Sequence, residues 1–151
     1  MSIFNSELIK IIEDKDTLKS IATVSRDGIP HVVYKQSLHI EEDMVVFYDL
    51  IQSSQVNKNL VNSIWFNGKV AISILAKDKR NFLITGRPVK SVTAGKNFEN
   101  IYSKLQDKKG KEVELSAIWY IEPITIREET YETRRKEEQE KYPYIRHLDL
   151  I

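Results

Sequence analysis

The chain has 151 residues, of which 41% are hydrophobic and 30% are charged, and its formal net charge at pH 7 is +1. This length suits one domain with its own core, and the balanced charge excludes a global electrostatic attraction to nucleic acid or to an acidic membrane. The absence of cysteine excludes disulfides, thiolate zinc sites and thiol catalysis, and favours a cytoplasmic protein. The N-terminal sequence carries acidic residues and breaks its apolar run too early for a signal peptide or a membrane span.

The first part of the chain predicts a helix followed by a β-hairpin. Asn5 can cap a helix whose apolar residues recur at helical spacing up to about Asp16. Residues 18–25 are rich in strand-forming residues, residues 30–39 resume in alternation, and Arg-Asp-Gly at 26–28 is a turn signal between them. The two stretches therefore predict paired antiparallel strands.

Four more strands and two more helices are predicted up to residue 123. The strands are expected at residues 44–48, 69–76, 81–92 and 113–121, and the helices at about 54–62 and 94–105. Pro123 predicts a bend or an edge beyond the last strand. Six strands in one domain favour a closed barrel, because closure removes exposed strand edges.

The segment from 47 to 60, FYDLIQSSQVNKNL, predicts a phosphate-binding site. The first-turn N–H groups of a helix have no partner within the helix, and the helix dipole favours an anion there. Ser53 and Ser54 can add hydroxyl donors, and Gln55 and Lys58 lie within the following turn. The alternative is that Ser53 only caps the helix.

The order of these segments resembles a known family. A helix, the strand pair TVSRDGIPHVV, the segment FYDLIQSSQVNKNL, the strand KVAISIL, then FLITGRPVKSV and a helix are similar to the split-barrel proteins that bind flavin mononucleotide (FMN). That family includes pyridoxamine 5′-phosphate oxidase and small bacterial flavin-binding and flavin-reductase proteins. The resemblance covers about residues 6–126.

The resemblance implies a fold, an assembly and a division of the chain. The expected fold is mainly β within the α+β class, a six-stranded antiparallel split β-barrel with flanking helices. The expected assembly is a homodimer with FMN between the subunits. Residues 1–126 would form the FMN-binding barrel. The residues of 127–151 themselves predict a charged helix and an apolar tail that pack on the barrel or on the partner, with a frayed C-terminus as the alternative.

The resemblance also implies the cofactor-binding residues. The phosphate would be held by the second strand and by the start of the helix after the third strand, at Lys35, Gln36, Ser37, Ser53, Ser54 and Gln55. Many relatives carry Ser-Arg-Lys where this chain has Ser-Ser-Gln, which removes two positive charges from the site. Lys35 and Lys58 can restore cationic character. Backbone at 47–50 would meet the flavin ring edge, and Asp49 would contact the ribityl chain.

Three functions follow from the resemblance. The first is an FMN-dependent oxidoreductase that takes electrons from a reduced nicotinamide and passes them to a small acceptor. The second is a flavin-binding electron carrier without a substrate pocket of its own. The third is a split-barrel module that binds haem, another phosphorylated ligand or only a partner protein. True pyridoxamine 5′-phosphate oxidation is not expected, because the C-terminal RHLDLI holds a single arginine, Arg146, although Arg134 and Arg135 offer an alternative.

The remaining aromatic and imidazole side chains predict no further site. Trp119 lies in a strong strand, where packing in the core is its expected role. His31 and His39 are expected on one face of the second strand but too far apart to chelate a metal. His147 has only Asp149 nearby, which falls short of a usual ligand set. No metal site is therefore predicted.

Overall fold

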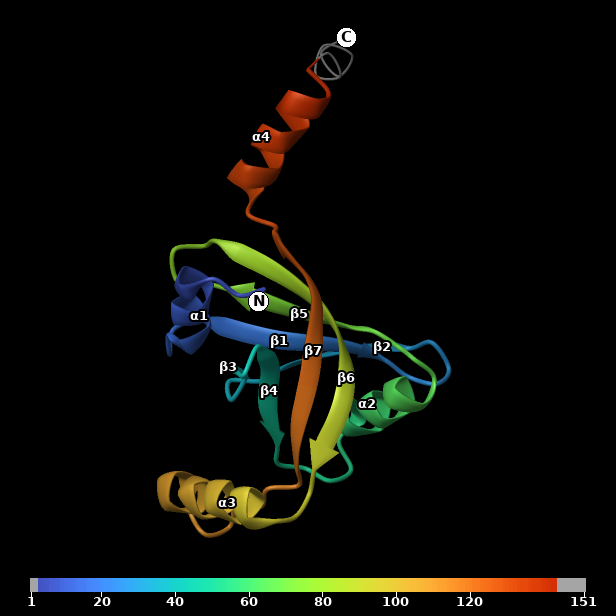
Figure 1. The fold of residues 1–151 in the computed structure, drawn as a ribbon, viewed down its shortest axis with the longest axis vertical. Helices are drawn as coiled ribbons and strands as arrows, with labels where there is room; N and C mark the ends of the chain where they lie inside the picture. The colour runs from blue at the N-terminus through green and yellow to red at the C-terminus, as the bar shows by residue number, and fades with distance from the viewer. Residues whose placement is uncertain (1–2, 144–151) are drawn as a thin grey trace.

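The computed structural model describes residues 3–143, which form one antiparallel sheet with flanking helices (Figure 1). In chain order the elements are α1 (Ser6–Glu13), β1 (Leu18–Val24), β2 (Pro30–Tyr34), β3 (His39–Glu41), β4 (Met44–Asp49), α2 (Gln55–Trp65), β5 (Val70–Leu75), β6 (Asn81–Val92), α3 (Lys96–Lys109), β7 (Ala117–Glu128) and α4 (Tyr131–Lys141). The strand order is β2-β1-β5-β6-β7-β4-β3. The predicted antiparallel, mainly β architecture is confirmed.

The two edges of this sheet are held close together by the chain itself. β2 lies at one edge and β3 at the other, and only residues 35–38 join them. A link of that length spans less than about 20 Å even when fully extended. The sheet must therefore curl until its edges approach, which produces a barrel.

Alternating side chains fill the inside of the curled sheet. The buried cluster draws on β1, β4, β5, β6 and β7, and its strand members include Ile21, Val45, Phe47, Ile72, Ile84, Trp119 and Ile121. Helix α1 contributes Leu8 and Ile12 to it, and α2 contributes Val56 and Leu60. The predicted core position of Trp119 is confirmed, and its indole N–H donates to Asn57 Oδ1 at 3.0 Å.

A second, smaller cluster holds α3. Phe98 of α3 packs with Val46, Ile118 and Leu115, which lie on β4, β7 and the loop before β7. Since side chains alternate along a strand, Val46 points away from the barrel interior that its neighbour Phe47 fills. This segment of β4 is thus buried on both faces, which explains its unbroken apolar sequence.

The structure has seven strands where six were predicted, because the second predicted strand is divided. The Lys35 amide still donates to the Lys19 carbonyl of β1, after which the chain turns and the amide of Leu38 donates to the Lys35 carbonyl. The Leu38 side chain is fully buried. Its carbonyl accepts from the ammonium of Lys19 at 2.8 Å, which fixes the turn to β1. Lys35, Gln36 and Ser37 therefore lie in this turn and not on a strand.

The last strand begins and ends later than predicted. β7 pairs with β4 only up to Ile121 and continues beside β6 alone, so Pro123 lies where one edge of the strand is free. The bend or edge predicted from Pro123 is confirmed. Gly86 faces Pro123 at a register shift, and a Cβ atom on Gly86 would lie 2.7 Å from the Glu122 carbonyl oxygen. Only glycine permits this close approach of β6 to β7.

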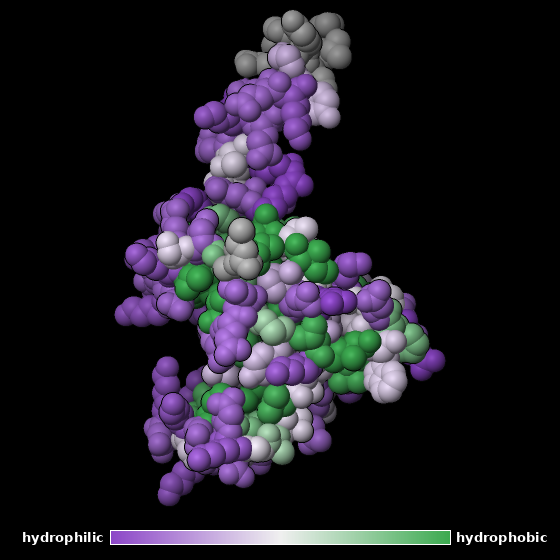
Figure 2. Space-filling view, viewed as in Figure 1, coloured by the Kyte–Doolittle hydropathy of each residue, from purple (hydrophilic) through white to green (hydrophobic). Residues whose placement is uncertain are grey.

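Helix α4 extends away from the barrel after β7 (Figure 1), and none of its side chains is buried. Its surface is hydrophilic (Figure 2). Of the apolar tail residues expected to dock, Tyr142 is exposed, and those from Tyr144 onward lie outside the described residues, as does His147. Within residues 3–143, no helix is both long enough and apolar enough to cross a membrane.

Candidate functional site

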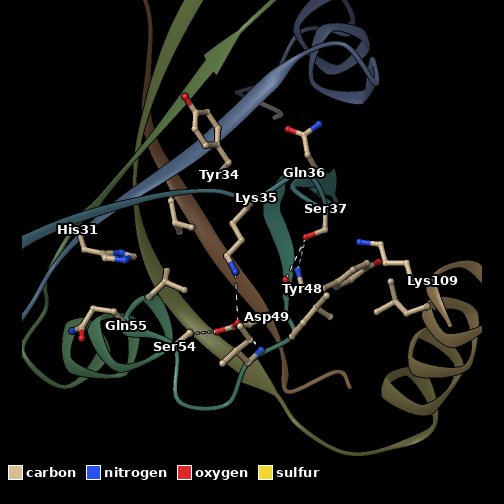
Figure 3. Close-up of a pocket in the computed structure, with 15 residues that line it drawn as sticks. His31, Tyr34, Lys35, Gln36, Ser37, Tyr48, Asp49, Ser54, Gln55 and Lys109 are labelled. Carbon is tan, nitrogen blue, oxygen red and sulfur yellow. Dashed lines mark hydrogen bonds and ion pairs between the residues drawn. The ribbon is translucent and has the colours of Figure 1, made fainter. Parts of the chain in front are cut away.

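A pocket of about 370 Å³ opens beside the turn between β2 and β3 (Figure 3). Its other walls are β2, the end of β4, the start of α2 and the last turns of α3. The lining residues are His31, Val33, Tyr34, Lys35, Gln36, Ser37, Tyr48, Asp49, Leu50, Ile51, Ser54, Gln55, Val56, Leu105 and Lys109. The volume lies in the range of small-molecule sites, and the lining combines apolar walls with a few convergent polar groups, as such sites do.

Most of the residues named by the sequence analysis meet at this pocket. Lys35, Gln36, Ser37, Asp49, Ser54 and Gln55 all line it. Ser53 and Lys58 do not, and both are exposed. The structure thus joins the turn, the end of β4 and the helix start into one site.

Ser54, and not Ser53, caps helix α2. The Ser54 Oγ atom accepts from the Asn57 amide at 3.1 Å, and its hydroxyl donates to Asp49 Oδ2 at 2.6 Å. A serine hydroxyl has one proton to donate. Because that proton is already committed to Asp49, Ser54 has none left for a ligand in this arrangement.

Asp49 is a buried carboxylate at the base of the pocket, with a side chain that is 1% exposed. Besides the Ser54 hydroxyl, it accepts from the Ile51 amide at 3.2 Å, and the Lys35 ammonium lies 3.6 Å from Oδ1. A charge without these partners would be costly to bury. The three donors therefore explain how this carboxylate is tolerated at the end of β4.

Lys35 supplies the cation on the opposite wall. Its side chain is 16% exposed, and its ammonium lies 5.6 Å from the centre of the Phe47 ring as well as beside Asp49. Figure 3 shows the side chain reaching from the turn toward Asp49. Lys35 is thus held over the pocket base as part of an ion pair.

The first turn of α2 retains free backbone donors. The amides of Gln55 and Val56 form no hydrogen bond with any of residues 3–143, whereas the Asn57 amide is capped by Ser54. The first turn holds no acidic residue. The side-chain amide of Gln55 donates to Asn59 Oδ1 at 2.8 Å. These free amides can receive an anion or a carbonyl oxygen from a ligand.

Ser37 fixes the turn to β4. Its hydroxyl oxygen accepts from the Tyr48 amide at 3.0 Å, and its hydroxyl lies 3.4 Å from the Tyr48 carbonyl oxygen. Burial raises the pKa of the Tyr48 phenol above its usual range, so that this wall of the pocket stays neutral. Ser37 therefore acts mainly on the protein backbone.

His31 is a pocket residue that the sequence analysis did not select. Its Nδ1 atom is buried and has no hydrogen-bond partner among the described residues. The side chain comes from β2, and it lines the pocket together with Lys35 of the turn that follows this strand (Figure 3). His39, expected on the same strand, lies on β3, where its ring contacts the Ser37 carbonyl and Glu41. Among residues 3–143, no group of metal-ligating side chains is assembled.

Several solved structures share this fold. HupZ from Group A Streptococcus matches with a TM-score of 0.69 at 20% identity, over 85% of this chain and 96% of the other. An FMN-binding protein from Syntrophomonas wolfei subsp. wolfei matches with a TM-score of 0.61 at 16% identity, over 82% and 86%. HutZ, the haem storage protein from Vibrio cholerae, matches with a TM-score of 0.58 at 12% identity, over 85% and 95%.

The chain has the split-barrel fold of the pyridoxamine 5′-phosphate oxidase-like proteins. No protein-family model matches it, and no curated protein does. The split-barrel fold implied by the sequence resemblance is therefore confirmed by structure, at low sequence identity.

Part of the pocket is formed by side chains that no sequence motif indicated. Tyr34 and Tyr48 line it from β2 and β4, and Leu105 and Lys109 reach it from α3. Nothing in the sequence indicates that the end of α3 lies near β4, because that contact depends on the packing of Phe98 and its cluster.

Proposed function

We propose that this split barrel binds a flavin, FMN in the first place, in the pocket between the β2–β3 turn and helix α2. The observation that supports this most is that one pocket gathers Lys35, Gln36, Ser37, Asp49, Ser54 and Gln55, six of the eight residues that the resemblance implies. The fold shared with an FMN-binding protein supports it as well.

The ring portion of a flavin fits the walls of this pocket. Val33, Leu50, Ile51 and Val56 offer apolar surface for a planar ring system. Gln36 and His31 offer polar side chains for its edge. This end of the site suits a flavin.

The phosphate group of FMN finds only some of the partners that it needs in this pocket. The free amides of Gln55 and Val56 and the ammonium of Lys35 would receive it, as expected at a helix start. Asp49 places a fixed negative charge in the same region. The site thus offers fewer unopposed cationic groups than a Ser-Arg-Lys sequence would supply.

The activity proposed is that of a small FMN-dependent oxidoreductase. A bound flavin would supply electron transfer between a reduced donor and a small acceptor, while the chain's residues bind, orient and shield it. A flavin carrier without its own substrate is the related alternative. Oxidation of reduced nicotinamide by the flavin-loaded protein, above the rate of free FMN, distinguishes the enzyme from the carrier.

The proposed assembly is a homodimer. Val32 and Tyr34 of β2, with Trp65 and Phe66 at the end of α2, are exposed apolar side chains beside the pocket-forming elements. Such apolar surface favours association. In this proposal residues 1–126 form the barrel unit, and 127–151 dock on the second copy. Sedimentation of the full chain tests it, with a dimer expected and a monomer contradicting it.

Haem is a second candidate ligand, which His31 favours. The imidazole of His31 would hold the haem iron, within a pocket whose lining is largely apolar. HutZ shares the fold. Absorbance spectra after separate addition of FMN and haemin test both candidates. The flavin proposal expects saturable flavin binding, and a haem spectrum that depends on His31 without any flavin binding would favour the alternative.

A further inference from the structure

We propose that the Asp49 carboxylate occupies the position in this pocket that the phosphate of a ligand would take, and that it competes with that phosphate. The pocket would therefore bind phosphorylated and unphosphorylated flavins with similar affinity. This inference rests on the proposed flavin binding and specifies which flavin forms the site accepts.

The contacts of Asp49 are those that a phosphate would need. Its carboxylate takes the Ser54 hydroxyl at 2.6 Å and the Ile51 amide at 3.2 Å, and pairs with the Lys35 ammonium at 3.6 Å. Figure 3 shows these partners converging on one side chain at the base of the pocket. A helix-start hydroxyl, a loop amide and a lysine are typical phosphate partners. Here an internal carboxylate already uses all three.

Asp49 is not free to leave this position. Its side chain is 1% exposed, and one of its partners is a backbone amide of the loop that leads into α2. Its other oxygen holds the hydroxyl that caps the helix. Turning the carboxylate toward solvent would break its hydrogen bonds with the Ser54 hydroxyl and the Ile51 amide and leave the Lys35 ammonium without its counter-charge.

The charges around the pocket also disfavour a ligand phosphate. The charged side chains that line it are Lys35, Lys109 and Asp49, and Lys35 is neutralised by Asp49. Lys109 lies exposed at the end of α3. A phosphate that approaches Lys35 or the first turn of α2 also approaches a buried like charge, where the repulsion is weakly screened.

Equilibrium titrations of the full chain with FMN and with riboflavin test the inference. The wild-type protein should bind the two with similar dissociation constants. Asp49→Asn keeps an oxygen acceptor for Ser54 and frees Lys35, and should bind FMN about tenfold more tightly or better, while riboflavin affinity changes by less than about twofold. Asp43→Asn is the matched control, because it removes one acidic charge at an exposed turn away from the pocket.

The ratio of the two affinities separates this role from a purely structural one. If Asp49 only supports the helix cap, Asp49→Asn will change both flavin affinities alike, and the inference is wrong. A wild-type preference for FMN of more than about tenfold would also overturn it.

If circular dichroism shows that Asp49→Asn is unfolded, Asp49→Thr serves the same purpose, since it keeps a hydroxyl on a β-branched residue. Failure of every variant and of the wild type to bind either flavin would instead refute the proposed function, and this inference with it.

Discussion

The hydroxyl of Ser54 donates to the Asp49 carboxylate at 2.6 Å, and this contact joins the first turn of α2 to the end of β4. The same oxygen accepts the Asn57 amide, so that one side chain serves as helix cap and as partner of a buried charge. The base of the pocket therefore depends on Ser54, whose hydroxyl is already used in hydrogen bonds within the protein. Lys35, the Asp49 partner from the turn, completes this base.

Replacement of Ser54 is expected to destabilise the protein, whereas replacement of Ser53 is not. Ser54→Ala removes the cap of α2 and one donor to buried Asp49, which should lower the free energy of unfolding by about 1–2 kcal/mol. Ser53→Ala is the matched control at an exposed neighbouring position, with an expected change below about 0.5 kcal/mol. Urea unfolding of both variants measures the difference. Equal losses would contradict the assignment of the cap to Ser54.

The buried Lys19 should make stability depend on pH in the alkaline range. Its ammonium donates to the carbonyls of Ile12 and Leu38, and burial lowers its pKa below the usual value. The unfolded chain keeps a pKa of about 10.4. Between the two pKa values the unfolded state binds more protons, so this group makes the free energy of unfolding rise with pH.

The Lys19→Met variant tests whether Lys19 makes the free energy of unfolding rise with pH. It retains an apolar stem of similar length but has no titrating group, so the wild-type minus variant difference in unfolding free energy should increase as pH rises toward about 10.4. Chemical unfolding at a series of alkaline pH values measures the difference. Parallel pH profiles for the two proteins would show that Lys19 keeps its usual pKa in the fold.

The close approach of β6 to β7 predicts that Gly86 tolerates no side chain. The Cβ of Gly86→Ala would lie 2.7 Å from the Glu122 carbonyl oxygen and 2.8 Å from Ile121 Cγ2. The strands would have to separate, at an expected loss of about 1–3 kcal/mol. Ser91→Ala, at an exposed position of the same strand, should change little. A fully stable Gly86→Ala protein would argue against the register shift at this position.

The indole of Trp119 is expected to couple energetically to Asn57. The Trp119 N–H donates to Asn57 Oδ1 at 3.0 Å and so links the barrel core to helix α2. In a double-mutant cycle with Trp119→Phe and Asn57→Ala, the coupling energy should be about 0.5–1.5 kcal/mol. Additive losses in the two single variants would show that the bond contributes no net stability.

The sequence was sufficient for the architecture and for six of the residues that line the pocket, and specific packing explains the remainder. Alternation and turn signals predicted the hairpin and the later strands, because they follow from local periodicity. The division of the second strand was missed, since it depends on the burial of Leu38 and on its contact with Lys19, which lies on β1. The cap was assigned to Ser53 in place of Ser54, because two adjacent serines offer the same local signal.

The role of Asp49 is the main feature of the site that sequence reasoning did not reach. Its place after a β-rich strand suggested contact with a ligand, but its burial and its partners Ser54, Ile51 and Lys35 arise only when the turn folds over β4. His31 was considered only as a metal ligand, and its unpartnered nitrogen is a property of the folded pocket.

Titration of FMN fluorescence with the full chain tests the central claim most directly, because it measures flavin binding at equilibrium and needs no retention during purification. The account predicts saturable quenching with a stoichiometry close to one flavin per chain. The Val33→Trp variant, whose larger side chain fills the pocket, should show no such quenching. Ile124→Trp, at an exposed site on β7 outside the pocket, should bind as the wild type does. Absence of saturable quenching by the wild-type protein, or equal quenching by the Val33→Trp variant, would contradict the account.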